Sequence, residues 1–406
     1  MAFNGYTIDH ITLAALDPFE ANCVALRTCS RKVEPLFGQQ GAKKGDAIRI
    51  RKPAQFTVRT GTAWSGQNIN EQYDTLTLNY QIGIDFEMSS MERKLDLNSL
   101  TDQCLKPAAI RLANEVDRIV LRDVALRTYL NVGTYATTPS STATYYDAGA
   151  RLSDMLAPRG KGQRHLNINP TMEGDVIQAI TPAQFNPSGK VGDMFTNADL
   201  DGVYQQGWNW HMDQNLYVHT NGARAGTPLI NGSTSEGATS VVTDGWTGSG
   251  AVAEGDRFTI ADVYAVHPIT KARLPWLQPF VVTAAGTNSG GALTINISPT
   301  IRASGAFQNV NALPADNAAL TFAGNASAIS TIGLGWHKEA VALAIVPLEK
   351  PGGVNDASMK YDSTSGVGMR YIEQYDIDTD MWKSRFDVVF GVLLQRPEHA
   401  IAVFAE

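Results

Sequence analysis

One long amphipathic segment, residues 99–131, limits the fold of this chain more than any other stretch. Its apolar residues recur every three or four positions, as on the buried face of a helix: Leu105, Ala108, Ala109, Leu112, Val116, Ile119, Val120 and Val124. A proline inside a helix costs about 3 kcal/mol, so Pro107 is expected in the first turn. The sequence therefore predicts a helix from Pro107 to Leu130, about 24 residues and roughly 36 Å long, ended by Gly133.

The segment before this helix changes to a period of two, which is typical of strands. Ile48 and Ile50 alternate with arginines, and apolar residues fill every second position from Leu76 to Phe86. About eleven residues at ~3.4 Å each predict a strand of roughly 35 Å. Residues 46–87 therefore predict a long two-stranded ribbon. Because such a ribbon is marginally stable alone, we expect it to pack either on its own domain or over a neighbouring subunit.

The ribbon's two arms are joined by the polar, glycine-containing segment 61–73, with Trp64 expected to be exposed near the tip. An exposed aromatic side chain at the end of a long ribbon is typical of a contact with another molecule. This segment is therefore the first candidate for a functional surface.

Composition favours a protein that buries surface against other subunits. Charged residues are 18% of the chain, below the usual ~25%, and no apolar run approaches a membrane span. The acidic residues near the N-terminus exclude a signal peptide, so we expect a protein made in the cytoplasm. Cys23, Cys29 and Cys104 form no metal-binding pattern, and buried, reduced thiols are expected. The net charge of -7 argues against a dedicated nucleic-acid binder.

The rest of the chain alternates short helices and strands, which predicts an α+β fold. Helices are expected at 17–30, 143–156 and 172–180, strands at 166–169, 387–394 and 400–404, and a helix running into a strand at 335–346. Residues 222–324 differ in composition, with 11 charged residues in 103 and short strand patterns at 239–243, 257–260, 280–284 and 293–297. Strands bounded by Gly, Pro and Asn at such spacing predict a small β-barrel or sandwich inserted into the α+β fold.

The sequence contains no complete catalytic or phosphate-binding motif. There is no nucleophile elbow and no glycine loop with the Lys-Ser/Thr of a phosphate loop. The basic segment Arg159 to Arg164 lacks the preceding strand of such a loop, so a solvated loop is favoured over weak phosphate contact. His337 is interpreted as a cap or a packed side chain, and Trp208 and Trp210 as core residues rather than an aromatic platform.

The sequence also lacks a complete metal-binding motif. Asp376, Asp378 and Asp380 resemble the start of a calcium loop, but the sixth position is Met381 and the twelfth is Asp387, where glycine and glutamate are needed. The seven histidines show no zinc spacing. We therefore expect no catalytic residue, no cofactor and no metal.

The order of these elements resembles the major capsid protein of tailed bacteriophages, and most closely the short-tailed subgroup with an inserted β-barrel. The resemblance is also carried by four short stretches: 111–116 (RLANEV), 254–260 (EGDRFTI), 335–344 (GWHKEAVALA) and 395–400 (QRPEHA). It implies the tailed-phage capsid fold, an α+β fold with a long β-hairpin, a peripheral domain built on the long spine helix, and an axial domain.

The resemblance also implies the domain order. The parts are an N-terminal arm (1–45), an extended β-hairpin loop (46–90), a peripheral domain with the spine helix (91–142), a first axial part (143–221), an inserted β-barrel domain (222–324), a second axial part (325–380) and C-terminal peripheral strands (381–406). The hairpin tip contains no lysine, so the covalent cross-linking of some relatives is not expected. No large maturation cleavage is expected in the N-terminal arm.

By the same resemblance, the chain is expected to form an icosahedral shell, as pentamers and hexamers of itself, in the virion. Assembly would take place in the host cytoplasm, with a scaffolding protein, a portal protein and packaged double-stranded DNA that is contacted non-specifically, and without a membrane. The hypothesised subunit interface at the hairpin tip consists of Arg59, Trp64, Asn68, Glu71 and Tyr73.

Two other functions remain open. An encapsulin-type nanocompartment shell would use the same fold to hold cargo enzymes, although the large insertion argues against it. A glycan-binding or glycan-degrading virion protein is suggested by the Thr/Ser/Gly-rich β segment, although a degrading enzyme would need paired carboxylates in a cleft.

Overall fold

The computed structural model describes residues 8–31, 43–52, 72–89, 105–183, 200–353, 356–362 and 366–406, together with residues 56, 61, 62, 64 and 66. The chain forms two compact units. The first comprises residues 1–52, 73–120 and 341–395, and the second 53–72, 121–340 and 396–406. Helix α5 (Lys106–Arg127) belongs to the first unit up to Val120 and to the second from Leu121.

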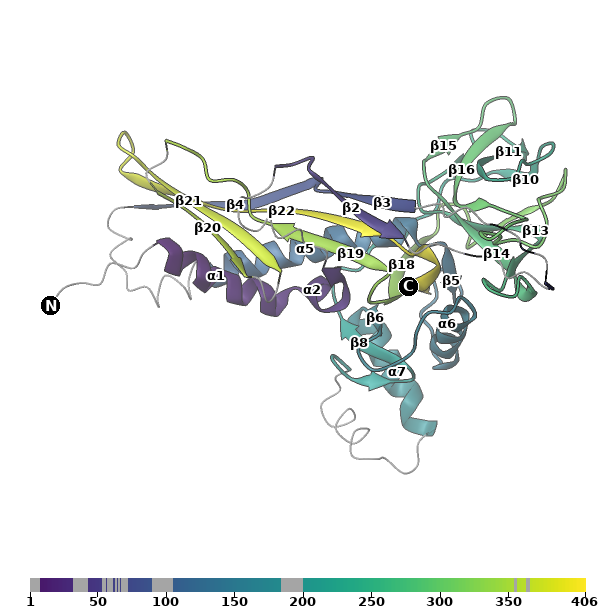
Figure 1. Cartoon of the computed structure of the whole chain (residues 1–406), viewed down its shortest axis with the longest axis horizontal. Coiled ribbons are helices and arrows are strands. Elements are labelled where there is room, and N and C mark those ends of the chain that lie inside the picture. Colours follow the sequence, from purple (N-terminus) through teal and green to yellow (C-terminus); the bar gives the residue numbers. More distant parts are fainter. Residues whose placement is uncertain are drawn as a thin grey trace. The chain divides into compact units, whose positions relative to one another are not determined.

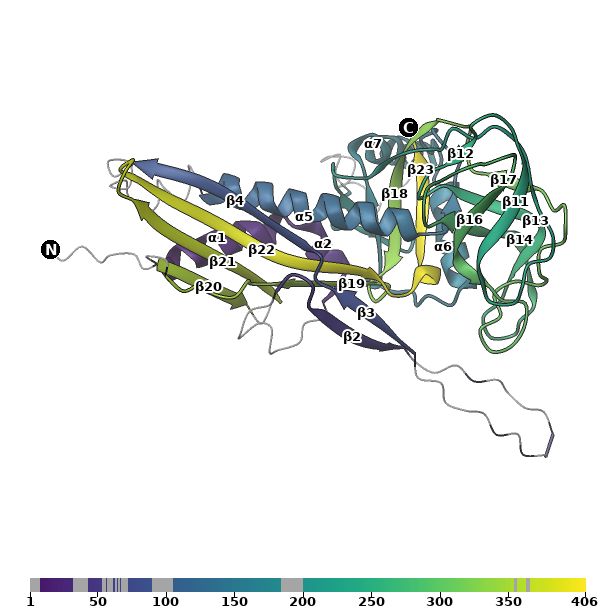
Figure 2. The same ribbon diagram turned by 90° about the horizontal axis from the view of Figure 1, so that it is seen from above.

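The first unit is built on a six-stranded sheet of long strands (Figure 2). Its order is β1 (Ser30–Arg31), β19 (Val341–Val346), β22 (Met381–Leu394), β21 (Val367–Asp376) and β20 (Asp356–Asp362), and β4 (Tyr80–Ser89) also pairs with β22. β1 is parallel to β19, and the other pairs are antiparallel. The apolar strand predicted at 387–394 is the second half of β22.

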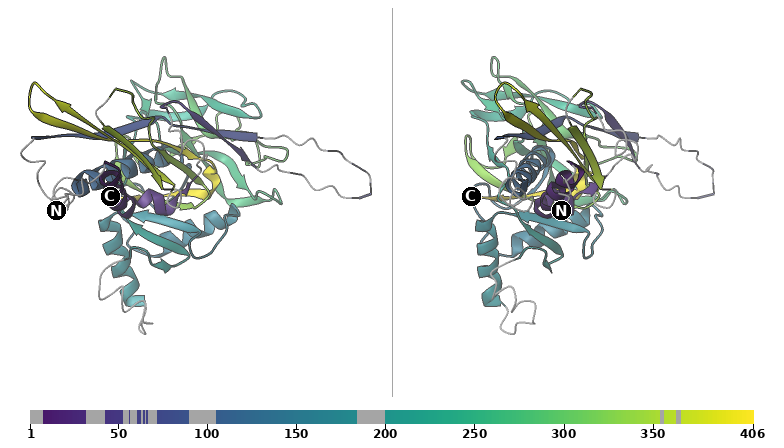
Figure 3. Two further views of the ribbon diagram at one scale, coloured as in Figure 1. Left: turned by 60° about the vertical axis from the view of Figure 1, so that its left-hand side comes forward. Right: turned by 90° about the vertical axis from the view of Figure 1, so that its left-hand side faces the viewer.

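Helices α1 (Ile8–Asn22), α2 (Val24–Thr28) and the first part of α5 lie on one face of this sheet (Figures 1 and 3). The buried Asp117 of α5 holds α2 in place. Its carboxylate accepts hydrogen bonds from the amides of Val24 and Ala25, each at 2.9 Å, and from the Cys23 thiol at 3.2 Å. Burial raises the pKa of that thiol, so it stays protonated and can donate. The first amides of a helix have no partner within it, and Asp117 supplies one.

The predicted spine helix is confirmed, except at its C-terminal end. The residues assigned to its apolar face are buried, apart from the half-buried Ala108. The helix ends at Arg127 rather than Leu130, because the chain turns there into strand β5 (Leu130–Val132). Leu130 then pairs with Ile401 in a parallel ladder, and Gly133 follows the strand instead of the helix.

The prediction of one continuous ribbon was wrong in its second arm. β2 (Ala47–Lys52) pairs with β3 (Gln72–Thr77). The second arm is not one strand, because β3 ends before Leu78 and Asn79, and β4, which follows them, pairs with β22 instead of β2. The period of two persists across the break because alternation records which face is buried and not which strand is the partner.

The base of the β2–β3 hairpin packs on its own unit. Ile48, Leu76 and Leu78 are buried with apolar residues of β19 and β22. Gly391 permits this contact, because a Cβ there would lie 2.3 Å from the Thr77 carbonyl oxygen. The hydrophobic contact that a two-stranded ribbon requires is therefore supplied within the subunit at this end.

The second unit contains a seven-stranded mixed sheet flanked by α6 (Ala143–Asp154) and α7 (Pro170–Ala183). Its order is β5, β23 (Ala400–Ala405), β18 (Ile329–His337), β6 (Arg164–Ile168), β8 (Trp208–Met212) and β7 (Tyr204–Gln205), with β9 (Val218–Thr220) also paired to β18. The helices predicted near 143–156 and 172–180 and the strands near 166–169 and 400–404 are confirmed.

The helix predicted at the start of 335–346 is wrong. These residues form the end of β18, a turn and β19. Every residue of β18 from Ile332 to His337 is buried, so both faces of the strand are covered there and its apolar run shows no alternation. A short, fully buried strand of this kind cannot be distinguished from a helix by periodicity alone.

Residues 226–322 form a separate six-stranded sheet within the second unit (Figure 2). Its order is β10 (Gly226–Ile230), β11 (Ala238–Trp246), β16 (Leu293–Ile301), β14 (Arg273–Val282), β13 (Arg257–Val266) and β17 (Leu320–Phe322), and β12 (Ala251–Val252) pairs with β15 (Gly286–Thr287). The four strand patterns predicted in this region are confirmed. Its buried core includes Trp246, Phe258 and Phe280.

Replacement of Asp117 by alanine should destabilise the protein. The change leaves two amides and a thiol without their acceptor, and we expect a loss of about 2 to 4 kcal/mol in the free energy of unfolding. The measurement is urea unfolding followed by tryptophan fluorescence. Glu115→Ala is the matched control on the same helix. It removes a partly exposed ion pair with Arg118 and should change stability by less than about 1 kcal/mol. Equal losses in the two variants would contradict the role given to Asp117.

Candidate functional site

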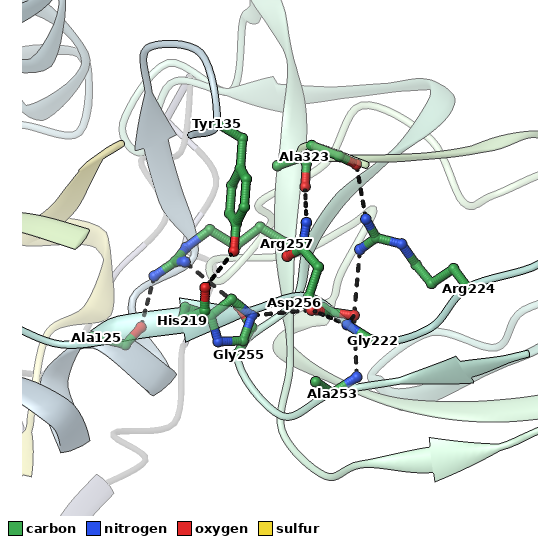
Figure 4. A network of polar contacts seen from close by, with 12 residues as sticks. Ala125, Tyr135, His219, Gly222, Arg224, Ala253, Gly255, Asp256, Arg257 and Ala323 are labelled. Carbon is green, nitrogen blue, oxygen red and sulfur yellow. Dashed lines mark hydrogen bonds and ion pairs between the residues drawn. The ribbon is translucent and has the colours of Figure 1, made fainter. Parts of the chain in front are cut away.

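The most concentrated polar network in the described part of the second unit lies where segment 222–324 begins (Figure 4). We call it the root cluster, and it consists of His219, Gly222, Arg224, Asp256 and Arg257. Asp256 is fully buried in the turn before β13. Its carboxylate accepts hydrogen bonds from the amides of Ala253, at 3.1 Å, and Gly222, at 3.2 Å, and lies 3.0 Å from Nε2 of His219. A buried carboxylate needs such a full set of partners to offset its loss of hydration.

Arg224 joins the two ends of this segment. One guanidinium nitrogen lies 3.3 Å from Oδ2 of Asp256, and another donates to the Gly324 carbonyl at 2.8 Å. The Asn221 side-chain amide reinforces the closure by donating to the carbonyls of Ala323 and Asn325, both at 2.9 Å. The chain therefore enters and leaves the segment at one place.

Arg257 connects the same cluster to the end of helix α5. Its guanidinium donates to the carbonyls of Ala125, at 2.7 Å, and Thr128, at 2.9 Å. The last carbonyls of a helix lack partners within it and carry partial negative charge, so a buried cation there is stabilised. Burial lowers the pKa of Arg257 to about 10, which still leaves it protonated at neutral pH.

Tyr135 packs beneath the cluster. Its hydroxyl donates to the His219 carbonyl at 3.0 Å, and its ring lies 5.0 Å from that of Phe404. Gly324 has a φ of +73° and touches the Tyr135 ring so closely that a Cβ would lie 2.5 Å from it. Only glycine meets both requirements at this position.

A second contact joins segment 222–324 to helix α6. The Trp276 indole of β14 donates to Asp154 at 3.4 Å, and the Arg151 guanidinium lies 5.4 Å from the indole ring centre. Cation–π contacts of this kind contribute about 0.5 to 1 kcal/mol when partly exposed. The segment is thus fixed both to the end of α5 and to α6.

The root cluster stabilises the fold by joining parts of the same chain. The polar side chains of Asp256, Arg257 and Arg224 are engaged by partners of the same chain, which leaves little to offer a substrate. Among the described residues, no group of three or more metal-ligating side chains could hold an ion. In the same part of the chain, no helix has the length and apolar character to cross a bilayer.

The predicted interface residues at the hairpin tip can be placed only in part. Arg59, Asn68 and Glu71 lie outside the described residues. Trp64 is 88% exposed, as predicted, and Tyr73 is 57% exposed with the Arg49 guanidinium 5.3 Å from its ring centre. Their role in subunit contact stays a prediction.

Other sequence interpretations can be compared directly with the structure. Trp208 and Trp210 are completely buried and donate to the carbonyls of Tyr145 and Gln205, so their assignment to the core is confirmed. Asp376, Asp378 and Asp380 form the turn between β21 and β22, where Asp376 pairs with Lys383 at 2.8 Å.

The solvated loop expected at 159–164 is wrong at its last residue. Arg164 is buried and donates to the carbonyls of Pro158, at 3.0 Å, and Gly149, at 2.9 Å. The buried side chain of Arg164 therefore holds the loop in place, while Arg159 and Lys161 are exposed.

Four histidines that are distant in sequence meet in the second unit. His165 and His211 lie 3.0 Å apart, and the rings of His337 and His399 are centred 6.0 Å apart. His337 is packed, as predicted, with its Nε2 3.0 Å from the Gln163 side chain. Sequence spacing could not reveal this group, because β6, β8, β18 and the turn 397–399 come together only through the sheet.

Sequence reasoning also missed the root cluster. A signal was present: Asp256 and Arg257 are adjacent charges within a segment that holds 11 charged residues in 103. Charged side chains in a segment with so few charges are expected to be paired with polar groups of the same chain and to stabilise its fold.

One protein family matches part of this chain. Residues 230–404, which are 175 of the 406 residues, match the family model described as P22 coat protein, gene protein 5. The match covers less than half of the chain and agrees with the resemblance to a tailed-phage major capsid protein that the sequence indicated.

Solved structures with similar folds include several capsids. A structure from Mycobacterium phage Che8 is 12% identical, with 94% of this chain and 90% of that chain covered and a TM-score of 0.46. A virus-like particle from Pyrococcus furiosus is 9% identical, with 98% of both chains covered and a TM-score of 0.41. The CUS-3 coat protein I-domain is 28% identical over 24% of this chain and 94% of its own, with a TM-score of 0.19. Curated proteins give no match.

Replacement of Asp256 by alanine should destabilise the protein strongly. The change leaves Arg224 and His219 buried without their acceptor, and removal of one partner from a buried pair costs about 3 to 5 kcal/mol. The free energy of unfolding in urea measures this loss. Glu254→Ala, an exposed carboxylate two residues away, is the control and should stay within about 0.5 kcal/mol of the unmodified protein. A loss below 1 kcal/mol for Asp256→Ala would contradict the structural role of the cluster.

The free energy of unfolding should fall on acidification, because buried histidines take up protons less readily in the folded chain than in the unfolded chain. Burial lowers the pKa of His165 and of His399 to about 4, with His211 and Arg396 respectively as further causes. The unfolded chain then binds protons that the folded chain excludes, so this stability is complete above about pH 6.5 and is lost as the pH falls towards 4.

The histidine contribution can be isolated with His399→Gln, which keeps a donor for the Met155 carbonyl but does not titrate. Urea unfolding at pH 7 and at pH 4.5 should show that the variant loses less stability than the unmodified protein. The expected difference is on the order of 2 kcal/mol. Parallel losses in the two proteins would contradict the assignment to His399.

Proposed function

We propose that many copies of this coat protein assemble into a closed icosahedral shell around double-stranded phage DNA. The observation that carries the proposal is the match of residues 230–404 to the P22 coat protein family. The α+β fold, with one long helix beside a sheet of long strands, is in keeping with it. Closure of the shell, its symmetry and its contents are the parts that experiment must test.

We also propose that residues 222–324 are an inserted β-barrel domain. The support is that β10 and the residues before β17, the two ends of the six-stranded sheet, are joined by hydrogen bonds. Ile230 donates to the Ala318 carbonyl at 2.9 Å, and Asn317 donates to the Ile230 carbonyl at 2.8 Å. A sheet closed in this way has no free edge at that point, which protects it from pairing with other chains. The root cluster would then attach the barrel at a single joint.

The other proposed parts keep the bounds predicted from the sequence. They are the N-terminal arm (1–45), the extended hairpin (46–90), the peripheral domain (91–142 and 381–406) and the axial domain (143–221 and 325–380). In this scheme α5 is the spine of the peripheral domain. The β2–β3 hairpin reaches over a neighbouring subunit, and Arg59, Trp64, Asn68, Glu71 and Tyr73 make the contact.

Assembly follows from many modest contacts. Each subunit would meet its neighbours through patches near the usual ~800 Å² per partner. Contacts that are individually weak become strong when closure engages several at once, and their weakness permits errors to be corrected. A scaffolding protein and a portal protein are the proposed partners during assembly in the host cytoplasm. DNA is the proposed content, and no resident cofactor is needed.

Trp64→Ala should weaken assembly without weakening the subunit. An aromatic side chain that is 88% exposed contributes little to folding, but an interface tryptophan commonly contributes about 2 kcal/mol. We expect a roughly tenfold or greater rise in the protein concentration at which particles form, with an unchanged melting temperature. Sedimentation velocity and calorimetry measure the two quantities.

Trp64→Phe is the matched control, because it retains an aromatic ring and should recover most of the assembly. Unchanged assembly with a lowered melting temperature in Trp64→Ala would contradict the interface role. If the unmodified protein gives no fast-sedimenting particle at any concentration, even with its scaffolding protein, the proposed function itself fails.

A further inference from the structure

Three segments of the second unit that carry four basic side chains are joined by backbone hydrogen bonds. The loop 158–164 contacts the turn after β18, since the Lys338 amide donates to the Gln163 carbonyl at 2.8 Å. The chain after residue 395 joins the same turn, since the Arg396 amide donates to the Ala340 carbonyl at 3.2 Å. We call Arg159, Lys161, Lys338 and Arg396 the basic surface.

These cations are available to a ligand. Arg159, Lys161 and Lys338 are exposed and Arg396 is half-buried. The Arg159 side chain donates to the Ser153 hydroxyl at 2.8 Å, and within the described residues none of the four forms an ion pair. The carboxylates in the same segments are Glu339 and Glu398, so the cations outnumber them two to one.

The residues beneath the basic surface strengthen its positive potential. Arg164 is buried there, and its guanidinium is held by carbonyl and hydroxyl groups without a carboxylate. Burial lowers the pKa of His165, His337 and His399, and the neighbouring cations Lys338, Arg164 and Arg396 lower it further. Glu339 opposes the effect of these cations on His337 and His399.

The loop that carries two of the cations is held in place. The Gly162 amide donates to the Asn209 side chain at 3.1 Å, and Arg164 binds the Pro158 carbonyl at 3.0 Å. A cation on a fixed backbone loses less conformational entropy when it binds than one on a free chain. Because the positions are spread over three segments, they suit a long polyanion better than a single small one.

We propose that the basic surface binds the phosphate backbone of double-stranded DNA without sequence preference. This inference rests on the proposed function and names the part of the subunit that touches the packaged DNA. Lysine and arginine contacts with phosphate release counterions, and each contact adds about -0.9 to the slope of log K against log salt concentration. Three or four contacts give a slope of about -2.7 to -3.6, so binding is weak at physiological salt. Weak binding is compatible with the packing and release of DNA.

The test measures binding of the full-length, unassembled coat protein to a fluorescent 20-base-pair duplex at several salt concentrations. The variant is Lys161→Gln with Lys338→Gln. The matched control is Lys44→Gln with Lys350→Gln, which makes the same change in net charge at exposed lysines of the first unit. We expect the first double variant to reduce the slope by about 1.8 and the affinity at 50 mM salt by roughly tenfold or more, and the control to change neither.

Three results would overturn the inference: no DNA binding by the unmodified protein at 50 mM salt, equal losses in the two double variants, or binding of polyglutamate with the same slope as DNA. The last result would indicate an acidic protein segment as the ligand. Particle formation by the same variants is scored separately by sedimentation. Particles that form normally while DNA binding is unaffected by Lys161→Gln and Lys338→Gln refute the inference alone and leave the shell function intact.

Discussion

The second unit depends on how it accommodates two adjacent buried charges, Asp256 and Arg257. Neither can keep its water, and the loss of hydration has to be offset by protein groups. Asp256 is satisfied by backbone amides, His219 and Arg224, which close the two ends of segment 222–324 on each other. Arg257 is satisfied by the last carbonyls of α5. One dipeptide therefore joins the segment to itself and to the end of the long helix.

If the protein is a shell subunit, as proposed, this arrangement suits its assembly. A capsid protein needs a stable monomer and weak contacts between monomers, because strong contacts would trap errors before the shell closes. The buried charges and the apolar cores of the two units provide stability within the chain. Under the proposed function, exposed apolar side chains such as Trp64 make the contacts between copies.

The sequence predicted elements well wherever local pattern decides structure. The amphipathic face of α5 and the alternation of β4 follow from covering one face with protein and the other with water. Prediction from the sequence failed where the structure depends on which other segments pack against a strand. The end of β18, residues 332–337, is buried on both faces and so shows no period of two, and the alternation across residues 76–86 could not reveal that β3 and β4 have different partners. The root cluster joins residues far apart in sequence, and only the paucity of charge around Asp256 indicated it.

The central claim, that copies of this chain close into a shell, is tested most directly by negative-stain electron microscopy of the purified protein over a concentration series, with and without its scaffolding protein. The account predicts closed particles of even wall thickness and uniform diameter, appearing above a threshold concentration. Protein that stays monomeric at every concentration in the presence of the scaffolding protein, or that forms only irregular aggregates, would contradict it.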